Sequence, residues 1–257
     1  MLRVTVLGSG SAGNAVLVRA GGAAVLLDAG LSARQLAVRL EACGVEPGSL
    51  NGILLTHEHS DHTQGLPVFC RKHRVPVYAN AATAAVLRED ASLAGIPWRI
   101  FQTGAECEVG ALMFQSFSVP HDATDPVGFV LRQNGAALAY LTDLGFATKL
   151  VRERARGVHT VLIETNHDER LLQDDTRRPW SVKQRILSRH GHLSNSSAAE
   201  VVADLCAEGL RRAILCHLSR DCNRPELAEE AVRARTGSGI EVFAALQSEL
   251  SPEYLVG

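Results

Sequence analysis

Short apolar runs separated by turns dominate the first part of the chain. The runs at 2–7, 15–19 and 24–28 have the length of β-strands, and Gly21-Gly22 favours a tight hairpin between the second and the third. A fourth run at 52–55 predicts a buried strand that emerges at a sheet edge. The chain is therefore expected to open with a sheet.

The rest of the chain alternates between helical and strand patterns. Ser32 and Gln35 predict a capping box, and Ser197 with Glu200 predicts a second one. Asn134-Gly135 favours another hairpin. The pattern predicts helices at 32–43, 63–73, 80–90, 147–156, 182–189, 197–209 and 225–235, and strands at 76–79, 112–119, 127–132, 136–142, 158–165, 212–216 and 240–245.

Two successive βα halves follow from this order, each with strands inside and helices outside. Such halves pack sheet against sheet with helices on both flanks, which is a four-layer αββα sandwich of the α/β (α+β) class. With 257 residues, 46% hydrophobic content and no low-complexity linker, the chain is expected to form a single domain over 1–257.

Charge and cysteine usage limit the function classes. The net charge of -2 excludes a protein that is basic throughout, but 149–190 carries ten Lys or Arg against six Asp or Glu. That excess indicates either a solvated face or a surface for phosphates.

No apolar run has the length of a signal segment or a membrane span, and the six cysteines form no CxxC pair, so a cytoplasmic protein with reduced thiols is expected.

The most informative stretch is 56–62, Thr-His-Glu-His-Ser-Asp-His, directly after the buried strand at 52–55. His57, His59, Asp61 and His62 offer imidazole nitrogen for zinc and carboxylate oxygen that also admits manganese or iron. A solvated polar loop is the plain alternative. Four ligands at this spacing favour a metal site, and one such loop can supply two ions.

Other candidates stand alone at the ends of predicted strands. They are His121, Asp143 and His217. Each is an ordinary surface or capping residue when taken singly, yet strand ends are where rigid scaffolds hold ligands. The glycine-rich segment 8–14 is a weak phosphate-loop signal, because no helix follows it, and a tight turn explains it better.

Together these motifs resemble the metallo-β-lactamase-fold hydrolases over nearly the whole chain, through Asp28, the 57–62 loop, His121, Asp143 and His217. The resemblance implies that one divalent ion, Zn²⁺ or Mn²⁺, is held by His57, His59 and His121. It implies a second ion held by Asp61, His62 and His217, with Asp143 bridging both. Asp28 is implied to be a structural residue beneath the site.

Further motifs are similar to those of the small bacterial YycJ/WalJ-type branch, which is related to ribonuclease Z. These motifs lie at 8–14, 164–168, 191–195 and 217–226. The resemblance implies a DNA exonuclease, and nucleic acid, with DNA favoured over RNA, is the expected partner. The chain has Leu144 before Gly145 where the branch usually has threonine, a small departure because the ligand Asp143 is retained.

In a phosphodiesterase, hydroxide between two ions attacks phosphorus in line, with Asp61 as general base or water-orienting group. The resemblance makes His192 the candidate proton donor to the leaving oxygen, with Glu164 orienting its imidazole. A loop or capping role is the alternative for His192. Candidates for substrate contact are Ser11, Asn14, His167, Ser194 and Asn195 from the motifs, and Arg177, Arg178, Lys183, Arg185 and Arg189 from the basic stretch.

Three functions remain open at this point. A nuclease acting on DNA or RNA ends is favoured by the Glu164 and His192 pair. A small-molecule hydrolase of a cyclic or mononucleotide phosphodiester, a lactone, a thioester or a β-lactam is the alternative. A metal-holding regulatory protein without turnover is disfavoured by the complete ligand set.

Overall fold

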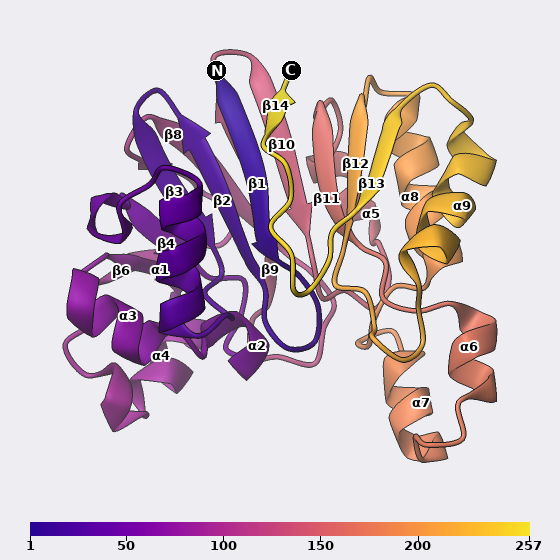
Figure 1. Ribbon diagram of the computed structural model, residues 1–257, viewed down its shortest axis with the longest axis horizontal. Coiled ribbons are helices and arrows are strands. Elements are labelled where there is room, and N and C mark those ends of the chain that lie inside the picture. The colour runs from indigo at the N-terminus through magenta and orange to yellow at the C-terminus, as the bar shows by residue number, and fades with distance from the viewer.

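The computed structural model describes residues 1–257, and its core is formed by two seven-stranded mixed sheets packed face to face (Figure 1). The first sheet has the order β14-β1-β2-β3-β4-β5-β6 and the second β13-β12-β11-β10-β9-β8-β7. The strands are β1 (Leu2–Gly8), β2 (Ala15–Ala20), β3 (Ala23–Leu27), β4 (Gly52–Leu54), β5 (Val77–Asn80), β6 (Trp98–Phe101), β7 (Glu106–Val109), β8 (Leu112–Ser118), β9 (Val127–Gln133), β10 (Ala136–Leu141), β11 (Thr160–Glu164), β12 (Arg212–Cys216), β13 (Glu241–Ala244) and β14 (Tyr254–Val256).

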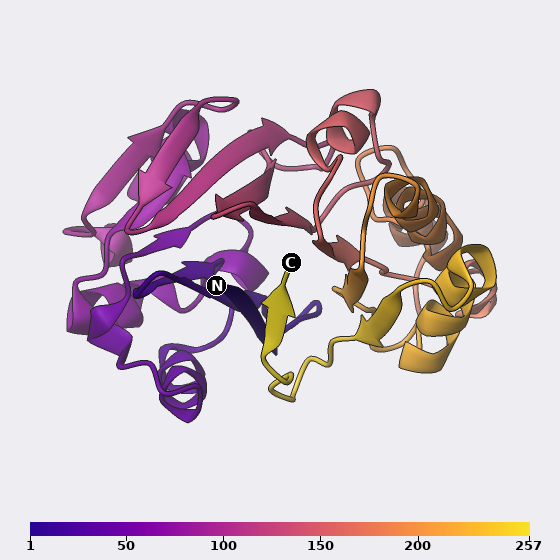
Figure 2. The same cartoon turned by 90° about the horizontal axis from the view of Figure 1, so that it is seen from above.

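Helices cover the outer face of each sheet (Figure 2). The helices are α1 (Ala33–Ala42), α2 (Ser60–Thr63), α3 (Leu66–His73), α4 (Ala81–Arg88), α5 (Lys149–Arg154), α6 (Glu169–Asp174), α7 (Trp180–Ile186), α8 (Asn195–Cys206) and α9 (Pro225–Thr236), with short 3₁₀ turns at Pro47–Ser49 and Ala91–Leu93. The expected four-layer αββα arrangement is confirmed.

Strand periodicity explains how the layers hold together. On β2, Val16 and Val18 point into the core between the sheets, while Leu17 points into the core beneath the first helical layer. On β12, Ile214 faces the core between the sheets and Leu215 faces the helices of the second half. Because both faces of these strands are buried, their sequences read as continuous apolar runs.

Several local expectations are confirmed. Ser32 and Gln35 form the capping box of α1. Gly21 and Gly22 both have positive φ in the β2–β3 hairpin, as do Asn134 and Gly135 between β9 and β10. All six cysteines are free thiols.

Other expectations are wrong. Helix α8 begins at Asn195, because the Ser194 hydroxyl accepts the Ser197 N–H at 3.2 Å, so Ser194 and not Ser197 is its N-cap. The helix expected at 63–73 begins later, as α3 at Leu66, and a separate short helix, α2, is divided from it and lies mostly within the stretch expected to be a loop. The division falls at Gly65, where a Cβ atom would lie 2.3 Å from the Leu31 carbonyl oxygen, so this close approach requires glycine.

The pattern also missed β6, β7, β14 and α6, which lie at sheet edges or on the surface. Three of the four residues of β6 are partly or fully exposed, and the same holds for β7. Strands with so little buried surface leave a weak apolar signal. Helix α7 begins two residues earlier and ends three residues earlier than the expected 182–189. None of the helices has the length and apolar character that a bilayer crossing requires.

Candidate metal centre

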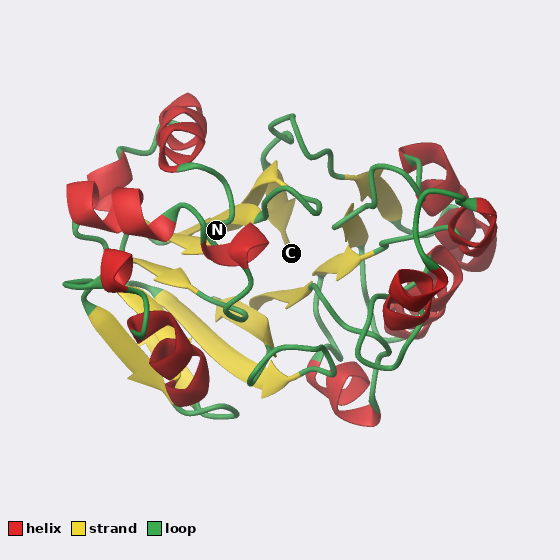
Figure 3. Cartoon of the chain, turned by 90° about the horizontal axis from the view of Figure 1, so that it is seen from below, coloured by secondary structure: helices red, strands yellow, loops and turns green.

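The candidate residues gather where the strands of both sheets end. Asp28 follows β3, the loop 55–62 follows β4, His121 follows β8, Asp143 follows β10 and His217 follows β12. Figure 3 shows the loops at this end of the molecule, seen from below. The long-range ligands are therefore brought together by strand ends, as expected.

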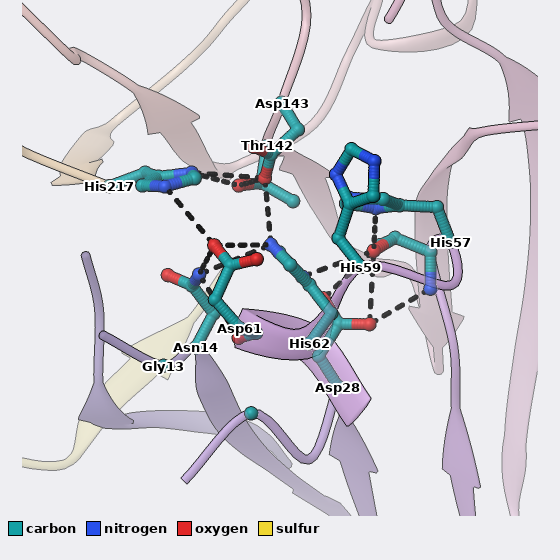
Figure 4. Close-up of polar contacts among 12 residues, drawn as sticks. Gly13, Asn14, Asp28, His57, His59, Asp61, His62, Thr142, Asp143 and His217 are labelled. Atoms are coloured by element: carbon teal, nitrogen blue, oxygen red, sulfur yellow. Dashed lines mark hydrogen bonds and ion pairs between the residues drawn. The ribbon is translucent and has the colours of Figure 1, made fainter. Parts of the chain in front are cut away.

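Asp28 is a fully buried carboxylate beneath the site. It accepts hydrogen bonds from the Thr56 N–H at 2.8 Å, the Thr56 hydroxyl at 3.0 Å and the Tyr140 hydroxyl at 3.1 Å, and it lies 2.8 Å from His62 Nδ1. A carboxylate at Nδ1 fixes the orientation of the imidazole and leaves Nε2 free to bind a metal ion. Asp28 thus orients His62, as Figure 4 shows.

Three histidines converge on one point. Ligand nitrogens of His57, His59 and His121 lie within 4.8 Å of one another. His57 Nδ1 lies 3.0 Å from the Thr56 hydroxyl, and His121 Nδ1 lies 3.1 Å from the Gly191 carbonyl oxygen. In both rings the other nitrogen, Nε2, is buried without a hydrogen-bond partner.

Unpaired buried nitrogens are rare because their desolvation is costly, so they indicate a missing partner. Burial, with His62 next in importance, lowers the pKa of His57 well below its ordinary value, and burial likewise lowers the pKa of His121. Neutral imidazoles are the form that binds a metal ion. The residues present therefore fit a divalent metal ion.

Asp143 lies between two groups of ligands. Its Oδ2 is 3.0 Å from both His62 Nε2 and His217 Nδ1, and its Oδ1 is 3.8 Å from His121 Nε2. Burial opposes ionisation of Asp143, but His217 and His62 outweigh it and hold the pKa of this carboxyl well below its usual range. An ionised carboxylate with one oxygen toward each group has the arrangement of a bridging ligand.

Asp61 completes the second group. Its Oδ2 lies 3.5 Å from His62 Nε2 and 3.6 Å from His217 Nε2. The Asn14 amide nitrogen lies 3.4 Å from the same oxygen, and the Asn14 N–H donates to the Asp61 carbonyl oxygen at 2.8 Å. The loop 8–14 forms a tight turn, as expected, and it fixes the position of Asp61.

Three of these residues adopt strained backbone conformations. Asp28, Asp143 and His217 have φ values of 58°, 51° and 53°. A left-handed conformation outside glycine costs on the order of 1–3 kcal/mol and persists only where surrounding contacts hold it. Here it turns the chain sharply at three strand ends and presents each side chain to the same centre.

Glu164 and His192 form a hydrogen-bonded pair beside Asp143. Glu164 is fully buried and its Oε1 lies 2.6 Å from His192 Nδ1, while its Oε2 accepts the N–H groups of Leu144 and Leu193. Burial opposes protonation of His192, but the Glu164 carboxylate outweighs it and raises the pKa of His192 to about 9. His192 Nδ1 lies 3.7 Å from Asp143 Oδ1, so the imidazole borders the metal ligands.

The predicted substrate contacts have varied surroundings. Ser194 caps α8, Asn195 pairs with Asn223, and His167 is buried with neither ring nitrogen bonded, whereas Ser11 is exposed. The basic residues all contact other protein groups. Arg177 and Arg178 form ion pairs with Asp175 and Asp221, and Arg185 forms one with Asp122. Lys183 donates a hydrogen bond to the Gln173 carbonyl oxygen, and the Arg189 guanidinium lies over the Phe146 ring. Their contact with substrate stays a prediction.

Sequence reasoning missed the residues that support the ligands. Thr142 donates to Asp143 Oδ2 at 2.7 Å, and the Glu58 carboxylate accepts from Thr124, which ties the 57–62 loop to the His121 loop. Asp122 Oδ1 lies 3.4 Å from His121 Nε2 and Asp122 Oδ2 binds Arg185. Their only signal was their position next to a ligand in sequence.

The comparisons agree with this geometry. The Beta-lactamase superfamily domain matches residues 23–218. Exodeoxyribonuclease YycJ of Bacillus anthracis is 37% identical over 234 residues, covering 90% of this chain and 88% of YycJ. Exodeoxyribonuclease WalJ of Streptococcus pneumoniae (strain D39) is 32% identical over 247 residues, covering 93% and 91%.

Among solved structures, the metallo-β-lactamase fold protein YhfI of Bacillus subtilis has a TM-score of 0.78 at 16% identity, covering 98% of this chain and 99% of YhfI. This similarity concerns the fold alone. The chain belongs to the β-lactamase superfamily of metallo-β-lactamase-fold hydrolases, in the branch that includes YycJ and WalJ.

Proposed function

We propose that the protein is a metal-dependent phosphodiesterase that removes nucleotides from nucleic-acid ends, with DNA as the favoured substrate. The observation that carries the proposal is the contact between His192 and the buried Glu164 beside the metal ligands. Phosphodiester cleavage expels a poor alkoxide leaving group, which needs a proton donor at this place. The exodeoxyribonuclease names of YycJ and WalJ support the same substrate class.

Two divalent ions would be held by the residues described above. His57, His59 and His121 would bind the first ion. Asp61, His62 and His217 would bind the second, and Asp143 lies between both groups. A set of imidazoles and carboxylates suits Zn²⁺ or Mn²⁺. When bound, such ions lower the pKa of a water between them and neutralise charge on the phosphoryl group.

Asp61 would orient the attacking water and take its proton. Burial raises the pKa of this carboxyl, but His62 outweighs the burial and lowers it, so Asp61 is ionised at neutral pH. About a quarter of its side chain remains exposed, at 23%, so water reaches it. An ionised and accessible carboxylate can accept a hydrogen bond from a water molecule, which suits Asp61 to orient the attacking water.

His192 would donate the proton to the leaving oxygen. Its Nδ1 is held by Glu164, so the proton available to a substrate is on Nε2. With a pKa of about 9, the imidazole is protonated at neutral pH. Thioesters and β-lactams need such a donor less, because metal ions stabilise their leaving groups directly, and this difference favours phosphodiesters.

The substrate's chain would extend over α6 and α7. These helices lie at the end of the molecule where the strand-end loops gather (Figure 1). Exposed Arg177 lies in the loop between them, and exposed Arg185 lies on α7, whose Lys183 is buried. The C-terminal end of α7 leads into the segment that contacts the site, because the Gly191 carbonyl oxygen holds His121. A polyanion bound there would therefore pass close to the ligands.

The decisive experiment uses purified protein loaded with Mn²⁺ or Zn²⁺. End-labelled single-stranded and double-stranded DNA and RNA are incubated beside bis-p-nitrophenyl phosphate. Release of mononucleotides from DNA is the expected result. Cleavage of bis-p-nitrophenyl phosphate without any cleavage of polynucleotides would instead favour a phosphodiesterase of small molecules, and no cleavage of either would refute the proposal.

A further inference from the structure

A cavity of about 350 Å³ lies beside the metal ligands, outside the residues that hold them. It is formed by the β1–β2 loop, the loop after β12 and the chain segment after β13. Figures 1 and 2 both show the β1–β2 loop beside the segment that leads from β13 to β14. Its volume lies within the range of roughly 300–1,000 Å³ that is usual for small-molecule sites.

The cavity shares a wall with the metal centre. Leu218 lines it and directly follows the ligand His217 in sequence. Ser9 also lines it, and the Ser9 hydroxyl accepts the His217 N–H at 2.8 Å. The backbone of His217 is therefore held by one residue of the cavity wall and continues directly into another.

The wall is fixed before any ligand binds. The Gln247 amide accepts the Ala12 N–H at 2.8 Å and donates to the Gly13 carbonyl oxygen at 2.8 Å, so two of the three segments are tied together. A preformed site loses less conformational entropy on binding than a mobile one. The shape of the cavity on this side is therefore set by the fold itself.

The lining combines apolar surface with positive charge. Leu218, Pro225 and Leu246 provide the apolar part, Arg178 and Arg220 provide guanidinium groups, and Asp221 provides a carboxylate that pairs with Arg178. Arg178 is paired with Asp175 and Asp221, whereas Arg220 is exposed and has no ion pair or hydrogen bond. A guanidinium next to an apolar wall suits a ligand with a flat ring and a phosphate, since guanidinium stacks on rings and binds phosphate oxygens.

We infer that this cavity binds the nucleoside next to the scissile phosphate. The base of that nucleoside lies against the apolar wall, and Arg220 lies beside the sugar–phosphate backbone of the substrate. The inference rests on the proposed function, and it adds that a single terminal nucleotide is held beside the metal centre. Such a subsite explains physically how cleavage is confined to an end, because the cavity accommodates one nucleoside and not a continuous stack.

The test is calorimetric titration of the Mn²⁺-loaded protein with thymidine 5′-monophosphate, thymidine 3′-monophosphate and inorganic phosphate. All three probes offer a phosphate to the metals, and the part of the affinity difference that is lost in Leu246→Trp measures the contribution of the nucleoside. We expect one thymidine monophosphate to bind at least ~10-fold more tightly than phosphate, equivalent to about 1.4 kcal/mol. The preferred isomer reports which side of the scissile bond the cavity holds.

Leu246→Trp fills the cavity from a position that is 37% exposed. We expect it to reduce the ratio of nucleotide to phosphate affinity toward one. Leu250→Trp is the matched control, because Leu250 is 38% exposed on the same segment and does not line the cavity, and its ratio should equal that of the wild type.

Equal affinity of the wild type for both nucleotides and for phosphate would overturn the inference. So would a nucleotide preference that Leu246→Trp leaves intact. Hydrolysis of bis-p-nitrophenyl phosphate is measured in parallel. If the protein prefers nucleotides to phosphate but does not cleave this diester, the cavity stands as a nucleotide site while the proposed function fails. If the protein cleaves the diester but shows no preference for nucleotides, only the assignment of the cavity is refuted.

Discussion

Glu164 Oε1 lies 2.6 Å from His192 Nδ1, and this contact joins a fully buried carboxylate to an imidazole that is 24% exposed. The same Glu164 accepts the Leu144 N–H through its other oxygen, directly after Asp143 in sequence. One side chain therefore positions both the proposed proton donor and the backbone next to Asp143.

The first prediction concerns the leaving group. His192→Ala should reduce cleavage of oligonucleotides by about 10²–10⁴-fold, the usual contribution of a general acid, but should reduce hydrolysis of bis-p-nitrophenyl phosphate much less. The reason is that p-nitrophenolate leaves without protonation and an alkoxide does not. The two rates and the metal content are measured on the same preparation.

His190→Ala is the control, since the side chain of His190 is exposed and makes no hydrogen bond. Equal losses on both substrates at full metal content would remove His192 from proton donation and return it to a structural role in the loop.

The second prediction concerns pH. The pKa of His192 is raised to about 9, so the donor is protonated below that pH, and oligonucleotide cleavage should fall as pH rises through that value. Glu164→Gln keeps the shape of the side chain but removes the charge that raises the pKa, which should then return toward the ordinary imidazole value of about 6.5. The basic limb of the pH–rate profile should move to lower pH.

A profile whose basic limb is the same in wild type and Glu164→Gln would contradict this assignment. Measurement of metal content across the pH range separates loss of metal from loss of the donor.

The third prediction concerns metal stoichiometry. Wild-type protein should bind about two divalent ions, and Asp143→Ala should lose both because its oxygens face both groups of ligands. His121→Ala should lose one ion. Elemental analysis of the purified proteins measures this, with Asp204→Ala on α8 as a control for removal of a surface carboxylate. Retention of both ions by Asp143→Ala would contradict a bridging position.

The fourth prediction concerns packing beneath Asp61. A Cβ atom on Gly30 would lie 1.6 Å from the Asp61 carbonyl oxygen. Gly30→Ala should therefore displace the 57–62 loop, lower the stability by roughly 1–3 kcal/mol or more and weaken metal binding. Gly239→Ala is the control, since the nearest atom to its Cβ would be 3.7 Å away. Thermal unfolding of both variants should separate them, and equal melting temperatures would contradict the prediction.

The fold and the clustering of the candidate ligand residues were predictable from the sequence because both have strong local signals. Strands buried on two faces read as apolar runs, and His57, His59, Asp61 and His62 stand within six residues. The remaining candidates could be named because each follows a predicted strand, which puts residues as distant as His121 and His217 at one edge.

What the sequence did not reveal depends on tertiary contacts. Tyr140 lies on an ordinary apolar strand, yet its hydroxyl reaches Asp28 across the two sheets. The cavity beside His217 is formed by three segments far apart in the chain, so no local pattern marks it. The N-cap of α8 was misplaced because Ser194 and Ser197 have the same chemistry, and only the hydrogen bond between them shows which one is the cap.

The final prediction concerns the substrate's chain. Arg177 and Arg189 are exposed and flank the two ends of α7, and Arg177 forms ion pairs with Asp175 and Asp221. Each phosphate contact with a single strand releases counterions and contributes about 0.7 to the slope of log affinity against log salt concentration. The double variant Arg177→Gln, Arg189→Gln should therefore bind oligonucleotides more weakly and lower that slope by up to ~1.4, while bis-p-nitrophenyl phosphate, which reaches only the metals, should lose far less.

Arg34→Gln with Arg99→Gln removes the same charge from exposed positions in the first half of the chain and should leave the slope as in the wild type. Neutral substitutions are preferable to charge reversal, because a glutamate at 177 would stand beside Asp175 and Asp221 and disturb the loop by repulsion. A slope that is the same in the Arg177/Arg189 variant and the control would mean that this stretch is a solvated face, and the substrate would then have to be held at the metals and the cavity beside His217 alone.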